Sequence, residues 1–407
     1  MRTFCLLTAF LVFDISSVAQ VFDAAVIRKH VEYLASDELE GRGTSSKGEE
    51  LAAAYIISEF KQLGLIPLRG DYRRPFRYRA RVNPHDTATA GEEKTAHNVV
   101  AYLDNGAKEH IVIGAHYDHL GLGHDHNSLA ANPEGQIHNG ADDNGSGTAG
   151  VLELARYFTS NNRLEPYNFI FICFSGEELG LLGSKKWCED PDVDLSSINY
   201  MVNMDMIGRL NDSTKKLIVY GVGTSPHFVP ILDSVTTPLV LKKDSSGIGP
   251  SDQTSFYLKN IPVLHFFTGQ HSDYHKPGDD ADKLNYKGQA EVLYFIAKVV
   301  EETFLYGKMP FSKTRNPDSG KVSFKVTLGV MPDYTYDGKG MRIDGVTDDR
   351  PAAKAGLLAG DIIVKLGDDE IKDIHAYMKA LSRFKKGDST TVEVERKRKI
   401  RKFNITF

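Results

Sequence analysis

The sequence predicts an α/β protein followed by a small β-rich domain. Through roughly the first 300 residues, apolar runs of about four to eight residues alternate with helical patterns, which is typical of a mixed central sheet covered by helices on both faces. Near residue 307 the chain becomes polar and proline-containing, and the remaining residues have a β-rich pattern with one helix. A chain of 407 residues is long enough for two domains.

The elements of the first domain follow from hydrophobic periodicity. Apolar residues at helical spacing predict helices over 23–35 and 48–63, and a third helix begins near residue 147. Residues 64–95 are rich in Pro, Arg and Gly, so we expect a loop or an edge strand there. Compact apolar runs predict buried strands at 98–103, 111–115, 169–174, 200–206 and 261–267.

The chain divides into four segments in this interpretation. Residues 1–19 are typical of a signal peptide, with Arg2, an apolar run and a small-x-small site ending at Ala19. We therefore expect a secreted or periplasmic protein in which Cys173 and Cys188 are the remaining cysteines. The α/β domain occupies residues 20–307, a linker occupies 308–320 and the β-rich domain occupies 321–407.

Charge and hydropathy exclude two broad classes of protein. The formal net charge is −5 and the pI is near 6.3, so no basic footprint for nucleic acid is present. After the N-terminal segment no apolar run reaches the ~18 residues that a membrane-spanning helix needs. Cys173 lies in an apolar strand, where a buried free thiol is common, so a disulfide with Cys188 is the less favoured alternative.

Acidic and imidazole side chains fall where the predicted strands end. Ligand-binding residues collect at the carboxyl ends of strands in α/β sheets, so we expect these side chains to meet at one edge. Two histidines and three carboxylates suit two zinc ions that share one carboxylate. The candidate metal ligands are His116, Asp142, Glu178, Asp205 and His275.

Five motifs resemble the di-zinc aminopeptidase family, which also includes glutamate carboxypeptidase-like and transferrin-receptor-like ectodomains and the glutaminyl cyclases. They are HYDHLG at 116–121, NGADDNGSGTAGVLELA at 139–155, FSGEELGLLGS at 174–184, NMDMIG at 203–208 and YHKPGDD at 274–280. The motifs occur in the family's order. The resemblance therefore implies a zinc exopeptidase-like fold that binds two zinc ions and hydrolyses peptides.

The resemblance also assigns individual roles. It places His116 and Asp205 on one zinc ion, Glu178 and His275 on the other, and Asp142 between them. Glu177 would be the general base, and Tyr274 a donor to the developing oxyanion. Asp118 would orient His116, Asp143 would follow Asp142 through a cis peptide bond, and Asp252 would support the site.

Two further segments are interpreted separately. His119, His124, His126 and His138 lie in or beside the loop 121–139, which we interpret as a solvated, substrate-facing loop without a metal. The C-terminal segment resembles a bacterial PDZ domain through TLGV at 327–330 and RPAAKAGLLAGDII at 350–363. That likeness implies that the backbone around Leu328, Gly329 and Val330 binds a peptide C-terminus, although a docking role without a free peptide remains open.

The sequence leaves three functions open. An aminopeptidase acting on peptide substrates is favoured because every ligand position and the base are occupied. A carboxypeptidase or a glutaminyl cyclase of the same fold is the closest alternative. A non-catalytic receptor or scaffold with a working PDZ domain is the third.

Overall fold

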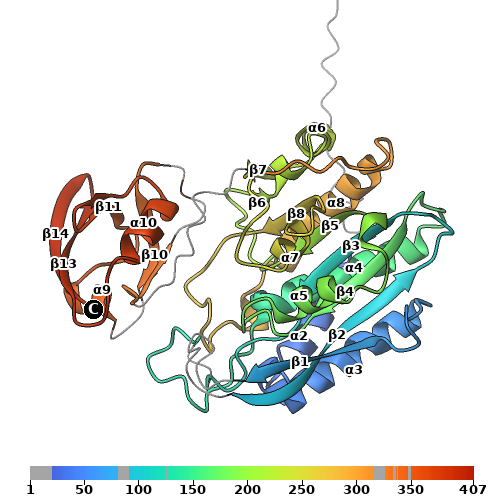
Figure 1. Ribbon diagram of the computed structural model, residues 1–407, viewed down its shortest axis with the longest axis horizontal. Helices are drawn as coiled ribbons and strands as arrows, with labels where there is room; N and C mark the ends of the chain where they lie inside the picture. Colours follow the sequence, from blue (N-terminus) through green and yellow to red (C-terminus); the bar gives the residue numbers. More distant parts are fainter. Residues whose placement is uncertain are drawn as a thin grey trace, which may run out of the picture.

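The computed structural model describes residues 21–80, 91–124, 127–314, 326–332, 336, 338–346 and 350–407 (Figure 1). The predicted signal segment 1–19 and His126 lie outside these residues.

An eight-stranded mixed sheet forms the centre of the first domain, in the order β1-β2-β4-β3-β5-β8-β6-β7. Its strands are β1 (Arg73–Ala80), β2 (Glu92–Leu103), β3 (His110–His116), β4 (Asn168–Phe174), β5 (Ile198–Met204), β6 (Lys216–Tyr220), β7 (Val240–Lys243) and β8 (Val263–Phe267). The five predicted strands correspond to β2, β3, β4, β5 and β8. The mixed sheet confirms the predicted fold class.

The four central strands, β4, β3, β5 and β8, are parallel to one another. Every residue of β3, β4, β5 and β8 is buried, as expected for strands covered on both faces. Because the chain leaves β3 for β4 on one side and reaches β5 on the other, β3 lies where the strand order reverses. Parallel pairing brings the carboxyl ends of all four strands to one edge of the sheet.

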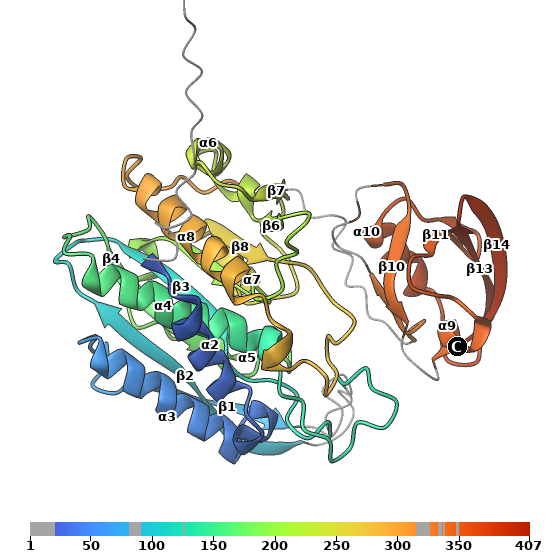
Figure 2. The same cartoon turned by 180° about the vertical axis from the view of Figure 1, so that it is seen from behind.

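Helices cover both faces of this sheet. The helices of the first domain are α2 (Ala24–Leu34), α3 (Lys47–Gln62), α4 (Gly147–Ser160), α5 (Leu182–Glu189), α6 (Phe228–Ser234), α7 (Gln253–Tyr257) and α8 (Tyr286–Thr303), with short helices η1 (Asp37–Arg42), η2 (Ala141–Ser146), η3 (Leu195–Ser197), η4 (Val222–Thr224) and η5 (Ala281–Lys283). One core joins α2, α3, α4, α6 and α8 to one face, seen in Figure 2, and a second core joins α5 and α7 to the other. Alternate residues of β4 enter the two cores, Phe171 the first and Ile172 the second.

The structure adds two strands that were not predicted, β6 and β7, and it decides between the two expectations for the segment that contains β1. β1 lies within the segment 64–95, where an edge strand was one of the two expectations, and pairs antiparallel with β2. β6 pairs antiparallel with β8 and parallel with β7, which extends the sheet at its other edge. β7 has only four residues, too few for a periodicity to show.

Residues 308–314 contact the first domain, which corrects half of the predicted linker. Met309 is buried in the main core, and Phe311 packs on the second core. The Thr314 backbone N–H donates to the Tyr257 hydroxyl oxygen over 3.0 Å. The remaining linker positions, 315–320, lie outside the described residues.

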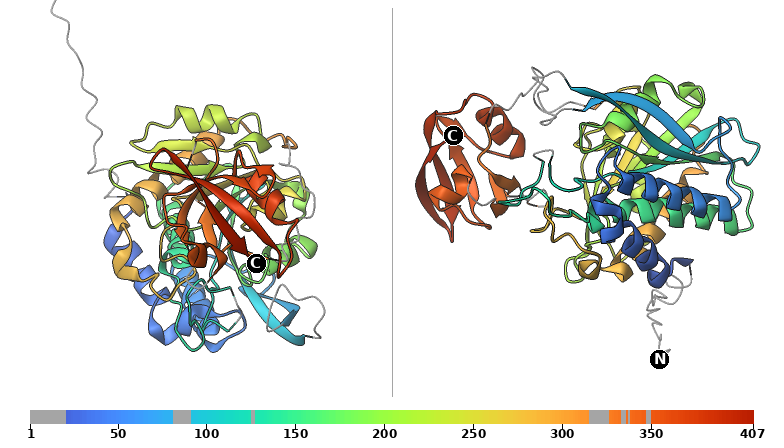
Figure 3. Two further views of the ribbon diagram at one scale, coloured as in Figure 1. Left: turned by 90° about the vertical axis from the view of Figure 1, so that its left-hand side faces the viewer. Right: turned by 90° about the horizontal axis from the view of Figure 1, so that it is seen from below.

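The C-terminal domain has its own six-stranded sheet, in the order β14-β13-β11-β10-β9 with β12 paired to β11. Its elements are β9 (Val330–Pro332), β10 (Met341–Val346), α9 (Pro351–Ala355), β11 (Ile362–Leu366), β12 (Asp369–Glu370), α10 (Ile374–Leu381), β13 (Ser389–Arg396) and β14 (Lys399–Thr406). A separate apolar core includes Leu328, Ile363 and Val392. Figure 3 shows this domain in orange and red.

Two further findings concern the described residues. No helix there combines the length and the apolar character needed to cross a membrane. Cys173 and Cys188 are both buried and both free. Burial raises the pKa of each thiol, to about 12 for Cys188, so neither is a reactive thiolate at neutral pH.

Candidate metal centre

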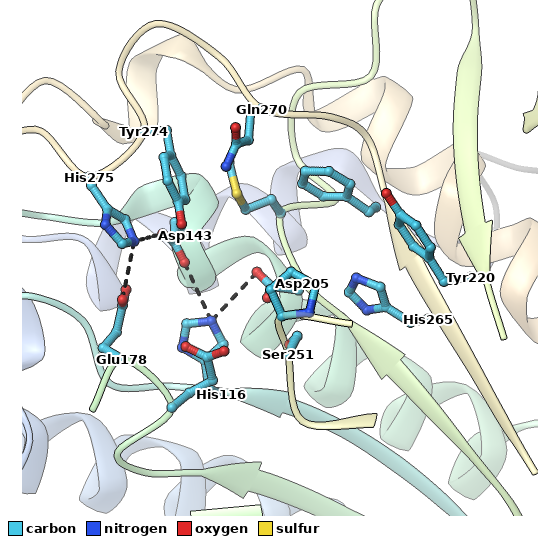
Figure 4. Close-up of a pocket in the computed structure, with 14 residues that line it drawn as sticks. His116, Asp143, Glu178, Asp205, Tyr220, Ser251, His265, Gln270, Tyr274 and His275 are labelled. Atoms are coloured by element: carbon cyan, nitrogen blue, oxygen red, sulfur yellow. Dashed lines mark ion pairs between the residues drawn. The ribbon is translucent and has the colours of Figure 1, made fainter. Parts of the chain in front are cut away.

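The carboxyl edge of the central strands brings the predicted side chains together. His116 is the last residue of β3, Asp205 follows β5, and Glu177 and Glu178 follow β4. His275 comes from the loop after β8 and reaches the same place (Figure 4). The convergence follows from the parallel pairing of the strands.

One group of ligand atoms surrounds His116. Its Nε2 lies 3.4 Å from Asp143 Oδ1 and 3.5 Å from Asp205 Oδ1. His116 Nδ1 faces the other way and lies 3.1 Å from the backbone carbonyl oxygen of Asp118. That contact fixes Nδ1 as a donor, so Nε2 is the nitrogen that would bind a metal ion held by the two carboxylates.

A second group surrounds His275. Its Nε2 lies 3.3 Å from Asp143 Oδ2 and 3.1 Å from Glu178 Oε2. His275 Nδ1 lies 3.0 Å from the backbone carbonyl oxygen of Asn127, so Nε2 is again the nitrogen that faces the carboxylates. The two groups meet at Asp143, whose carboxylate offers one oxygen to each (Figure 4).

Asp143, not Asp142, lies between the two groups, which corrects the predicted bridging residue. The Asp142 carboxylate is directed elsewhere: its Oδ1 accepts the Gly208 backbone N–H over 2.7 Å, and its Oδ2 lies 3.2 Å from His271 Nε2. The cis peptide bond is also displaced by one residue from the expectation, because it joins Asp143 to Asn144.

Asp279 fixes the loop that presents Asp143, although it was not among the predicted site residues. Its Oδ2 accepts the backbone N–H groups of Asp142 and Asp143 over 2.9 and 3.0 Å, and its Oδ1 lies 3.1 Å from Arg209. Asn144 holds the other side of the loop by donating to the Met204 carbonyl oxygen over 3.0 Å. The sequence signal that could have identified Asp279 is its place in the motif YHKPGDD.

Glu177 lies beside the two groups and is not part of either. Its backbone N–H donates to Asp118 Oδ1 over 3.1 Å, and Asp118 Oδ2 accepts the Thr44 hydroxyl over 2.9 Å. The Asp118 carboxylate thus positions Glu177, whereas its carbonyl oxygen faces His116. Burial holds the pKa of Glu177 well above its ordinary value, opposed by His116 and reinforced by Glu178.

The electrostatics of the cluster favour bound cations. Burial disfavours an imidazolium, yet Asp205 and Glu177 hold the pKa of His116 well above its ordinary value, and Glu178 does the same for His275. Burial would raise the pKa of Glu178, but His275 lowers it to about 2. These carboxylates therefore stabilise positive charge placed among them.

The distances fit zinc. Zinc bonds to nitrogen and oxygen are about 2.0–2.2 Å long, so neighbouring atoms of a tetrahedral site lie about 3.3–3.5 Å apart. The four ion-pair distances around His116 and His275, 3.1–3.5 Å, match that spacing. Asp143 Oδ2 and Asp205 Oδ1 are buried and make no hydrogen bond to another described residue. Nitrogen and oxygen donors of this kind suit zinc.

A small pocket of about 90 Å³, partly open to solvent, adjoins the cluster. Its side walls are neutral and largely aromatic, with Tyr220, His265, Phe267 and Tyr274 contributing rings. The Tyr274 ring stacks on His275 at 3.9 Å between centroids and lies over the cluster (Figure 4). Asp252, the neighbour of the pocket residue Ser251, is buried, and burial raises its pKa to about 7.

The histidines around the loop 121–139 differ from the expectation of solvated side chains. His119 and His138 are buried, and His124 is exposed. His138 Nε2 lies 2.7 Å from the Ser128 hydroxyl oxygen, a structural contact. His119 Nδ1 lies 2.7 Å from Glu178 Oε1, so His119 belongs to the cluster and not to a solvated loop.

The residues predicted to bind peptide in the second domain precede and begin an edge strand. Leu328 is buried, and Gly329 has φ +73°, a conformation that favours glycine. A Cβ at Gly329 would lie 2.2 Å from the Arg350 Cβ, so a side chain has no room. Val330 begins β9, which pairs with β10 and is the last strand of the sheet.

Comparison with known proteins agrees with this architecture. Residues 98–300 match the model of peptidase family M28, and residues 322–407 match the model of a PDZ domain. The chain is similar to leucine aminopeptidase 2 of Arthroderma otae, 28% identical over 229 residues, which covers 48% of this chain and 42% of the relative. The chain therefore spans about two fifths of that relative's length.

Solved structures with the same fold include an aminopeptidase from Aneurinibacillus, with TM-score 0.53 and 19% identity, covering 74% of this chain and 97% of that one. A glutaminyl cyclase from Porphyromonas gingivalis matches with TM-score 0.55 and 15% identity, covering 70% and 99%. At these identities the likeness concerns the fold. The chain belongs to peptidase family M28 through residues 98–300 and carries a PDZ domain at residues 322–407.

Proposed function

We propose that this protein is a zinc-dependent aminopeptidase that removes N-terminal residues from peptides. The observation that carries the proposal is the position of Asp143, which offers one carboxylate oxygen to the His116 group and the other to the His275 group. The similarity to leucine aminopeptidases supports the choice of substrate class. We assign His116 and Asp205 to one zinc ion, Glu178 and His275 to the other, and Asp143 to both.

The zinc ions supply two kinds of chemistry when bound: they polarise the peptide carbonyl and lower the pKa of a water molecule toward ~7. Glu177 supplies the proton transfer. Its carboxylate would accept a proton from the attacking water as the C–O bond forms and then deliver it to the amine nitrogen, so that the peptide C–N bond breaks and the amine leaves. Asp118 holds the Glu177 backbone and so aims this carboxylate. We assign Asp252 a supporting role beneath the site.

The pocket beside the cluster favours release of single residues. It lies directly beside the metal groups and is only partly open to solvent, whereas an endopeptidase needs an open groove on both sides of the cluster. Tyr274 lies over the metal groups, in position to donate a hydrogen bond to the developing oxyanion. The aromatic walls favour neutral, apolar side chains at the position that is cleaved.

Glu177→Gln tests the assignment of the base. The amide accepts no proton in this reaction, so kcat should fall by about 100- to 10,000-fold while both zinc ions stay bound. Glu189→Gln, an exposed change at the end of α5, is the matched control and should leave kcat unchanged. Zinc is measured by mass spectrometry of the dialysed protein. Full activity of the Glu177→Gln enzyme would rule out this role.

A peptide panel tests the reaction class. Peptides with a free N-terminus should be cleaved, N-acetylated peptides should resist, and C-terminal amidation should have no effect; a chelator should abolish cleavage. Cleavage that requires a free carboxylate identifies a carboxypeptidase instead. One tightly bound zinc ion per chain, together with cyclisation of N-terminal glutamine, identifies a glutaminyl cyclase.

The second domain and the N-terminal segment complete the proposal. We propose that β9 receives a peptide C-terminus as an added strand, with the backbone around Gly329 beside its carboxylate. The Gly329 N–H donates to the Thr327 hydroxyl oxygen over 3.0 Å, so ligand binding exchanges that contact. Residues 1–19 direct export to the periplasm or the exterior. N-terminal sequencing of the exported protein should begin near residue 20.

A further inference from the structure

We propose that His119 is a fourth protein ligand in the His275 group, so that the two zinc sites are inequivalent. The inference rests on the proposed function, because it concerns the same two ions. It adds one ligand and gives the two ions different coordination. One ion is held by four protein donors, and the other keeps an open position for water and substrate.

His119 contacts the same two carboxylates as His275. His119 Nδ1 is 2.7 Å from Glu178 Oε1 and 3.8 Å from Asp143 Oδ2. The ligand atoms of His119, Asp143 and Glu178 all lie within 4.8 Å of one another. His275 Nε2 faces the same Asp143 oxygen over 3.3 Å, and the two imidazole rings meet edge to face at 5.9 Å. Asp143 and Glu178 therefore contact both imidazoles.

The backbone fixes the His119 ring in that place. The His119 N–H donates to the Arg42 carbonyl oxygen over 3.1 Å, and its side chain is almost fully buried. Gly140, at φ +56°, leaves room for the ring, since a Cβ there would lie 2.4 Å from His119 Cδ2. A buried imidazole held this firmly against two carboxylates loses little entropy when it binds an ion.

The number of protein donors makes the two groups different. The His116 group holds three protein donors, namely His116 Nε2, Asp143 Oδ1 and Asp205 Oδ1. Structural zinc sites are closed by four protein ligands, whereas catalytic sites keep three and leave a position open. His116 and His119 stand on one segment at the end of β3, so this segment supplies one imidazole to each group.

Metal binding tests the proposal without relying on activity. Wild-type protein should bind two zinc ions with separate affinities, and X-ray absorption of protein loaded with one equivalent should show two imidazole ligands. His119→Ala should lower the zinc affinity of the tighter site, the His275 group, by more than about 100-fold. Removing even a residue that only hydrogen-bonds to a ligand lowers metal affinity by about 10- to 100-fold. The one-equivalent spectrum should then lose an imidazole.

His119→Asn separates a ligand from a positioning residue. Its side-chain amide keeps an N–H near the Nδ1 position, which preserves a hydrogen bond to Glu178, but an amide is a poor zinc ligand. Tight binding should therefore be lost in this variant too. Restored tight binding in His119→Asn, or a single imidazole in the wild-type spectrum, would overturn the proposal.

His138→Asn is the matched control, because His138 is another buried imidazole of the same region whose ring contacts Ser128 and Gln136. Its zinc affinities should stay within about threefold of the wild type. Circular dichroism of the metal-free variants checks that each remains folded. Wild-type protein that binds no zinc at all contradicts the proposed function, whereas two ions bound equally by wild type and His119→Ala contradict only this inference.

Discussion

Adjacent residues of one loop serve two different clusters, and their difference shows what makes a metal site. The metal-facing cluster consists of His116, His119, Asp143, Glu178, Asp205 and His275. The rear cluster consists of Asp142, Arg209, His271 and Asp279. Asp143 belongs to the first and Asp142 to the second.

The rear cluster neutralises itself within the protein. Asp279 accepts two backbone N–H groups and contacts the Arg209 guanidinium, and Asp142 accepts the Gly208 N–H and faces His271. The metal-facing cluster has no Lys or Arg in ion-pair contact with its carboxylates among the described residues. The buried carboxylates of the metal-facing cluster therefore depend on its histidines or on bound cations for their counter-charge.

Substituting each aspartate by asparagine gives the largest expected contrast. Asp143→Asn removes the charge shared by both groups, so zinc affinity should fall by more than about 100-fold and peptidase activity should disappear. Asp142→Asn keeps an acceptor for Gly208, so activity should stay within about tenfold of the wild type. Zinc content and kcat/KM of the two purified variants measure this. Equal losses in both would mean that the loop, and not the carboxylate, sets the metal site.

The sequence predicts which residues lie at the edge of the sheet, but it does not predict which aspartate of the loop with Asp142 and Asp143 faces the metal groups. The reason is physical. His116, Glu178 and Asp205 stand at the ends of continuous apolar runs, and the ends of parallel strands must meet. Asp142 and Asp143 are chemically identical neighbours in a loop. Which one faces the metal groups depends on Asp279, which is more than 130 residues away and holds both backbone N–H groups.

The remaining differences also come from tertiary contacts. His119 lies three residues beyond His116, and nothing in the local pattern distinguishes it from exposed His124. Its burial depends on the space left by Gly140 and on the Arg42 backbone. Likewise, the polar segment from residue 308 has linker composition, yet Met309 enters the core through packing that periodicity does not encode.

Asp279→Asn tests how strongly the rear cluster positions the metal-facing cluster. Its effect on zinc affinity and activity should be intermediate. An amide replaces one of the two acceptor oxygens, so either the loop N–H groups or Arg209 loses a partner. Zinc affinity and kcat/KM should fall by about 10- to 100-fold, the effect expected of a partner outside the ligand set. Asp280→Asn, one residue further and without contact to the loop N–H groups, is the control. An unchanged zinc affinity in Asp279→Asn would show that the loop holds its conformation without this carboxylate.

The smallest expected effect is that of His265→Gln on the stability of the protein in acid. His265 is a buried imidazole beside the metal-facing cluster whose Nδ1 lies 3.1 Å from Asn203 Nδ2, and burial lowers its pKa to about 4. In the unfolded chain the His265 imidazole has its ordinary pKa of 6.5, so on acidification it takes up a proton before the folded protein does. The stability that depends on neutral His265 is therefore complete above pH 6.5 and is lost as the pH falls toward 4. The difference corresponds to about 3 kcal/mol. Urea unfolding of metal-free protein should therefore show a smaller loss of stability between pH 7.5 and 4.5 in His265→Gln than in the wild type, by about 2 kcal/mol. Parallel losses in the two proteins would mean that acid acts through the carboxylates of the cluster and not through this imidazole.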